Sequence, residues 1–195
     1  MKRFISLFTA ILLALPLSAL ASTWNVDPNH TAMQFKVRHL MISNVKGVFE
    51  KFSGKLNLDD KDITKSKVEV NIDTSSVNTN IAKRDEDLRS ANFFDVAKFP
   101  GMAFSSTKVE KVGNDKLKIT GNLTIRGITR PVILDVDGLS QEIKDPWGNM
   151  RRGASATATI NRKDFGLTWN KTMDNGGMVV GEDVAIQLEV EFVRQ

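Results

Sequence analysis

The sequence of 195 residues contains no cysteine. No disulfide can therefore stabilise the fold, although this absence alone does not identify a redox compartment. Thiolate catalysis, zinc–thiolate sites and iron–sulfur clusters are excluded. We also expect no lipoprotein-type lipid anchor, because such an anchor requires a cysteine at the cleavage point.

Histidine is scarce, since only His30 and His39 are present. Neither belongs to a group of residues with the spacing of zinc ligands, so we expect no metal site. The nucleophile-elbow pattern Gly-x-Ser-x-Gly is missing, and so are the glycine-rich nucleotide and phosphate-loop patterns. We therefore expect neither catalysis nor a cofactor.

The chain has no block of like charges. Its 27 Lys and Arg residues are interleaved with 23 Asp and Glu residues, for a net charge of +4. Lys2 and Arg3 belong to a segment that we expect to be removed, which lowers the charge further. An evenly and weakly charged surface argues against a nucleic-acid partner.

Only the first residues form a long hydrophobic run. Lys2 and Arg3 precede an apolar stretch at 4–15, and Ala19-Leu20-Ala21 fits a small-x-small cleavage site. We expect a signal peptide at 1–21, cleaved after Ala21, and one domain at 22–195. No later segment is apolar enough for stable membrane insertion. The expected location is a bacterial periplasm.

Apolar and polar residues alternate along much of the remaining chain. Val184, Ile186 and Leu188, for example, alternate with Ala185 and Gln187. A period of two places each apolar set on one face of a strand. The pattern predicts about eight strands, at 23–39, 45–58, 67–73, 102–110, 116–126, 132–138, 153–162 and 183–193.

The first two predicted strands are unusually long for a globular protein. Long strands with bulges, which we predict at Pro28-Asn29 and Gly54, are typical of a coiled barrel. Gly113-Asn114-Asp115 predicts a hairpin turn, and 127–131 predicts another, with Pro131 before a strand start. The predicted fold is all-β, an eight-stranded antiparallel barrel.

One segment, 80–90, breaks the alternation. Ile81, Asp85 and Leu88 recur at helical spacing, and Asn80 or Thr79 is a candidate N-cap. A single helix inside an antiparallel meander usually covers an open end of a barrel. We therefore predict one helical insertion that closes one end.

Whether the interior is empty cannot be decided from periodicity. The seventh strand carries small residues on one face, Ala154, Ala156 and Ala158. They could leave an apolar slot beside bulkier strands, or they could compensate for residues such as Phe35 and Phe104 in a solid core. Both readings stay open at this point.

Several motifs resemble those of the YceI-like family. They are Asp27-Pro28-Asn29-His30-Thr31, Phe35-Lys36-Val37-Arg38-His39-Leu40, Val45-Lys46-Gly47-Val48-Phe49, Arg84-Asp85, Leu88-Arg89-Ser90, Phe93-Phe94, Phe99-Pro100, Leu123-Thr124-Ile125 and Asp164-Phe165-Gly166. The resemblance covers nearly all of 22–195. It implies an extended lipocalin-like barrel in a secreted bacterial protein, often a homodimer, that binds isoprenoid quinones or prenyl phosphates. Many relatives carry an aromatic residue where this chain has Ala154.

Strand parity together with this resemblance predicts the residues that line an apolar slot. They are Met33, Phe35, Val37, Leu56, Val70, Phe104, Ile119, Leu123, Leu134, Ala156, Ile186 and Leu188. Candidate contacts for a polar head group are Arg38, His39, Arg84 and Arg89, because guanidinium suits phosphate. Arg84 and Arg89 could instead form an ion-pair network that holds the helix on the barrel.

Two other functions stay as alternatives. The first is a protein-interaction module with a solid barrel core and binding loops. The second is an enzyme that acts on a lipid. We expect Trp147, which lies in a turn signal at 145–149, near an opening of the barrel.

Overall fold

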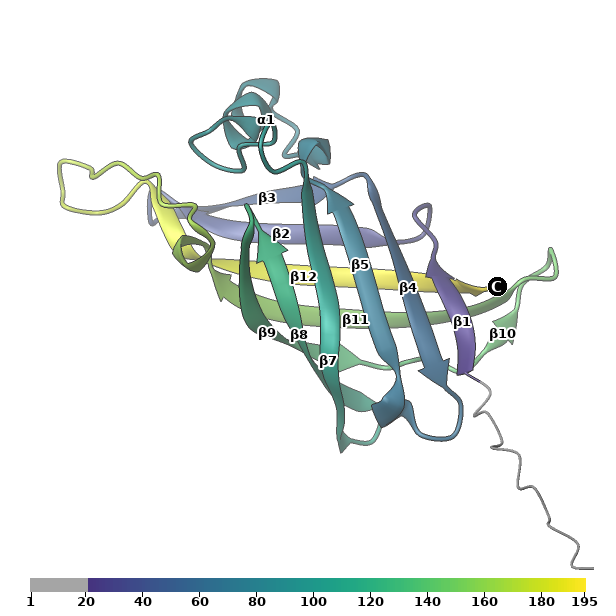
Figure 1. Ribbon diagram of the computed structural model, residues 1–195. Helices are drawn as coiled ribbons and strands as arrows, with labels where there is room; N and C mark the ends of the chain where they lie inside the picture. The colour runs from purple at the N-terminus through teal and green to yellow at the C-terminus, as the bar shows by residue number, and fades with distance from the viewer. Residues whose placement is uncertain (1–20) are drawn as a thin grey trace, which may run out of the picture.

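A computed structural model describes residues 21–195 of the chain (Figure 1). The predicted signal peptide lies outside the described residues except for Ala21, and its cleavage stays a prediction. Among residues 21–195, no helix has the length and apolar character needed to cross a membrane.

The described chain is mostly β-structure. The strands are β1 (Ala21–Val26), β2 (Ala32–His39), β3 (Ser43–Phe49), β4 (Phe52–Asp59), β5 (Lys67–Asp73), β6 (Val77–Asn78), β7 (Gly101–Gly113), β8 (Lys116–Ile125), β9 (Ile128–Asp137), β10 (Ile143–Lys144), β11 (Met150–Asn161) and β12 (Val180–Arg194). The helical elements of residues 21–195 are α1 (Ala82–Arg89) and three short 3-10 turns, η1 (Ile63–Lys65), η2 (Thr74–Ser76) and η3 (Arg162–Phe165).

The sheet closes on itself. Adjacent strands follow the order β11–β9–β8–β7–β5–β4–β1–β12, and β12 pairs back with β11 from Val193↔Arg151 to Asp183↔Asn161. This ring confirms the predicted eight-stranded antiparallel barrel with one helical insertion. In Figure 1, α1 lies over one end of the barrel, at the top of the view.

The two longest predicted strands are wrong as single elements. A turn divides 23–39, because Asp27 Oδ1 accepts the Asn29 N–H at 2.9 Å and Pro28 has no N–H to donate. The strand predicted at 45–58 is divided between β3 and β4. There the backbone N–H of Lys51 donates to Ser76 Oγ at 3.0 Å instead of to a neighbouring strand.

Glycine and proline mark other differences from the prediction. The bulge predicted at Gly54 is absent, since Gly54 pairs with Val70 in regular register. The two-residue turn Arg126-Gly127 has positive φ at both positions, 51° and 73°, so β9 begins at Ile128 rather than at 132. Pro131 therefore lies inside β9, opposite Asn122. It is tolerated because β11 pairs with β9 only at 135–137, which leaves its other edge free there.

The helix begins without the predicted cap. Its N-cap residue is Ile81, and no side chain caps it. Instead, the buried Asp85 carboxylate accepts hydrogen bonds from the backbone N–H and the hydroxyl of Thr79. The Thr79 hydroxyl thus acts as a donor to α1 and is not available as a cap.

Buried apolar side chains close the barrel end remote from α1. Trp24 has 0% exposure and packs with Leu56, Leu58 and Phe192. Its ring lies 5.3 Å from the guanidinium carbon of Arg152. This cluster, here called the Trp24 floor, borders the barrel interior.

Candidate functional site

The barrel interior is not filled by side chains. It contains two cavities, of about 160 and about 310 Å³. The smaller one, here called the far chamber, borders the Trp24 cluster, and the larger one, here called the helix-side chamber, borders α1. Residues common to both walls are Met33, Ile72, Leu123, Ile186 and Leu188. The two chambers are therefore neighbouring parts of one interior space.

The far chamber is almost purely aliphatic. Its walls come from the inward faces of β1, β2, β4, β5, β7, β8, β9, β11 and β12 and from the segments around η1 and after β9. Ser66, between η1 and β5, supplies the one side-chain hydroxyl among the described wall residues. Ala154 and Ala156 of β11 contribute little volume to this wall. Two of the three small residues noted in the sequence thus line this cavity, whereas Ala158 lines neither chamber.

The helix-side chamber has an aromatic wall. Phe35 and Phe49 lie with ring centroids 5.7 Å apart, and Phe94 meets Phe49 edge-on at the same distance. Phe93 packs on Trp169 at 5.3 Å. The loop after α1 supplies Phe93 and Phe94, and the segment after η3 supplies Trp169, so loops complete a wall that the strands also form.

Charged side chains are confined to the helix-side chamber. Arg38, Arg84, Asp87 and Arg162 line it, together with His39. None of the described residues that line the far chamber is charged. The interior therefore has one apolar end and one polar, net positive end.

Each of the twelve predicted slot residues lies on a chamber wall. The far chamber holds Leu56, Val70, Phe104, Ile119, Leu134 and Ala156; the helix-side chamber holds Phe35 and Val37; both include Met33, Leu123, Ile186 and Leu188. Their side chains are thus placed together around one space. Whether they contact a ligand stays a prediction.

The predicted head-group residues divide into two groups. Arg38, His39 and Arg84 line the helix-side chamber. Arg89 does not; its guanidinium donates to the carbonyl oxygens of Ser75 and Val77, both at 2.7 Å. Arg84 likewise donates to Thr79. Carbonyl and hydroxyl acceptors, rather than the predicted ion pairs, therefore hold the helix on the barrel.

Sequence reasoning missed Arg162, which is buried at the first position of η3 and lines the helix-side chamber. Its signal in the sequence was weak, because a single arginine at a strand end is usually solvated. Trp169 is part of the same wall. Trp147 is 81% exposed on the β10–β11 turn and lines neither chamber.

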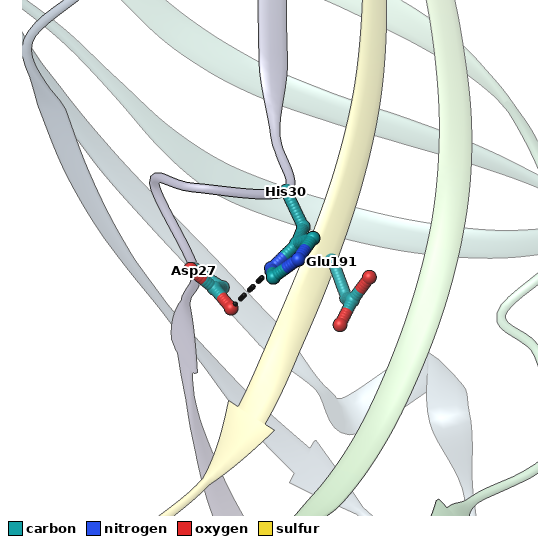
Figure 2. Close-up of side chains that lie close together, drawn as sticks. All are labelled: Asp27, His30 and Glu191. Carbon is teal, nitrogen blue, oxygen red and sulfur yellow. Dashed lines mark hydrogen bonds and ion pairs between the residues drawn. The ribbon is translucent and has the colours of Figure 1, made fainter. Parts of the chain in front are cut away.

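A second cluster of titratable groups lies outside both chambers. Asp27, His30 and Glu191 offer ligand atoms within 4.8 Å of one another (Figure 2). Arg151 already binds two of them, donating to Asp27 Oδ2 at 2.7 Å and to Glu191. The hydrogen bond from Arg151 to Asp27, together with the one between Asp27 and His30, lowers the pKa of Asp27 to about 2. The arrangement is an ion-pair network that joins β11, β12 and the turn after β1.

Comparison with known proteins gives a consistent result. A family model described as the YceI-like domain matches residues 24–192. A UPF0312 protein of Pectobacterium atrosepticum is 43% identical over 196 residues, covering 100% of this chain and 98% of the relative.

Solved structures with the same fold include a YCEI protein of Campylobacter jejuni. It has a TM-score of 0.69 and 30% identity, covering 98% of this chain and 99% of its own. A domain from Saccharophagus degradans, described as polyisoprenoid-binding, has a TM-score of 0.65 over 90% of this chain and 99% of its own. At 15% identity, this last likeness shows the fold alone.

Proposed function

The chain belongs to the YceI-like family, and from this premise we propose that it binds an isoprenoid lipid inside its barrel, without catalysis, as a carrier or storage protein. The ligand class is an isoprenoid quinone or a polyprenyl phosphate. We place this function in a bacterial periplasm, reached through the predicted signal peptide. Homodimer formation stays a prediction.

The observation that carries this proposal is the unfilled interior. Two adjoining cavities lined by aliphatic and aromatic side chains run from the Trp24 floor to α1. Burial of a CH₂ group contributes about 0.8 kcal/mol, so each five-carbon isoprenoid unit contributes on the order of 4 kcal/mol before the cost of association. A long prenyl tail can therefore bind through the hydrophobic effect alone.

The same cavities weigh against a protein-interaction module with a solid core. A barrel that served only as a scaffold would gain stability from filled space, because cavities cost free energy. An enzyme is weakly supported too. The hydroxyl of Ser66 borders the far chamber, whereas His39 borders the helix-side chamber, so no nucleophile and base meet among the described lining residues.

Lipid extraction tests the proposal directly. The full chain is expressed with its leader, purified from the periplasm without detergent, and its organic extract is analysed by mass spectrometry. We expect one isoprenoid per protein, and re-uptake of geranylgeraniol by the emptied protein with a 1:1 stoichiometry. A barrel that yields no lipid and takes up no prenol, while staying folded, contradicts the proposal.

A further inference from the structure

Arg162 is a buried cation in an apolar setting. It is 4% exposed, at the junction of β11 and η3, and it lines the helix-side chamber. Buried charges are normally paired with an opposite charge, because desolvation of an isolated ion is costly.

All of the hydrogen-bond acceptors of Arg162 are backbone carbonyls. Nε donates to Gly181 O at 2.8 Å, Nη1 donates to Leu167 O, and Nη2 lies 3.5 Å from Val180 O. No carboxylate of residues 21–195 forms an ion pair with it. The neighbouring Glu182 instead pairs with Lys163. A guanidinium has five N–H donors, so donors of Arg162 are left over, and the Glu182 carboxylate acts on its charge only through space.

The charge of Arg162 persists at neutral pH. Burial lowers its pKa, but the ordinary value for arginine lies far above 7. Two further guanidiniums, those of Arg38 and Arg84, line the same chamber, against the single carboxylate of Asp87. Arg38 and Arg84 also donate to neutral oxygens, those of Met41 and Thr79. The side chains that line the chamber thus carry more positive than negative charge.

We infer that Arg162 anchors an anionic head group, a phosphate or diphosphate ester, at the helix-side end of the interior. The prenyl tail then runs past Leu188 into the uncharged far chamber. This inference rests on the proposed function and narrows its ligand class, since a quinone carries no charge to match the three arginines. Guanidinium binds phosphate oxygens through paired, charge-assisted hydrogen bonds.

The test compares ligands that share one tail. Affinities of geranylgeranyl phosphate and geranylgeraniol are measured by the fluorescence of Trp169, which lines the same chamber. We expect the wild type to prefer the phosphate by about tenfold or more, the usual strength of a hydrogen bond to a charged group. Arg162→Gln removes this preference and leaves the affinity for geranylgeraniol unchanged. Arg162→Lys retains only part of it, because the charge is kept but the paired hydrogen bonds are lost.

A matched control is Arg130→Gln, which removes an exposed guanidinium that lines neither chamber. It leaves both affinities unchanged. The anchor role of Arg162 is contradicted if Arg162→Gln lowers the affinities for both ligands equally. It is also contradicted if the wild type does not prefer the phosphate. In both cases the proposed function stands. If Arg162→Gln does not fold, the wild-type preference and Arg162→Lys still decide. Failure of the wild type to bind either ligand overturns the proposed function itself.

Discussion

The two chambers of the barrel differ in how they are built. The far chamber is enclosed mainly by paired strands, among them β4–β5 and β8–β9 in regular register, and it borders the Trp24 cluster. The helix-side chamber is lined by strands together with α1, η3 and the loops that follow them. These irregular segments bring aromatic rings and the charges of Arg84 and Arg162 to its wall. A sheet supplies apolar side chains at alternate positions, whereas specific polar contacts come from irregular segments. This division matches a ligand with a uniform tail and a distinct head.

The largest expected effect contrasts two tryptophans. Trp24→Ala removes a fully buried ring from the floor, so we expect a loss of about 3–5 kcal/mol in the free energy of unfolding. Trp169→Ala removes a partly buried ring from the wall of the helix-side chamber, so we expect a smaller loss in the free energy of unfolding. Urea denaturation of both variants measures the difference. Equal losses of unfolding free energy in the two variants contradict the expected difference in packing between the Trp24 floor and the wall of the helix-side chamber.

The next test fills the far chamber. Ala156→Phe places a ring in its wall, and we expect the affinity for a long prenol to fall by about ten- to a hundredfold, the value of two or three lost CH₂ contacts. A ten-carbon prenol, which needs only the helix-side chamber, keeps its affinity. Thr157→Phe points outward on the same strand and serves as the control. Titration calorimetry with both chain lengths measures the effect. The same loss for short and long prenols argues against the division of the interior into two chambers.

A third test loosens the cover of the helix-side chamber. Asp85→Ala leaves the buried Thr79 N–H without its acceptor, which costs about 1–3 kcal/mol. We expect faster hydrogen exchange in α1 and faster release of bound prenol, with the far barrel unchanged. Asp85→Asn keeps one acceptor oxygen and should show a smaller effect. An equal increase in hydrogen exchange throughout the barrel would contradict this expectation.

The smallest expected effect concerns the ion-pair network outside the chambers. The pKa of Asp27 is lowered to about 2, so its ion pair with Arg151 stabilises the fold above the unfolded value near 4 and is lost as the pH falls from about 4 to 2. Stability at pH 7 exceeds that at pH 2 by at most about 2 kcal/mol from this group. Asp27→Asn should remove that part of the pH dependence in urea denaturation. An unchanged profile contradicts the assignment, and prenol affinity is expected to stay the same.

Much of the wall could be predicted from the sequence. The alternation of Ile186 and Leu188 with Gln187 correctly predicted which face of β12 points inward, because β12 pairs in regular register there. Parity failed to show the break at Asp27–Thr31, where a side chain captures a backbone donor and ends the strand. Local sequence patterns do not reveal where a side chain competes with strand pairing for a backbone N–H group.

The polar end was harder to predict, because its groups meet only in the folded chain. Arg162 becomes buried when Gly181 and Leu167 surround its guanidinium, and these residues are brought together by β12 and the segment after η3. Nor could the cavities be inferred from periodicity, since the volume left by Ala154 and Ala156 depends on how wide the barrel closes. Interior volume is a property of the closed barrel rather than of any one strand.

The division of the interior into a tail end and a head end is tested most directly by a crystal structure of the full domain with geranylgeranyl phosphate. We predict the phosphorus atom within hydrogen-bonding reach of Arg162, and continuous tail density past Leu188 into the far chamber. A head group at the Trp24 floor, or a lipid held on the outer surface with both chambers empty, would contradict the account.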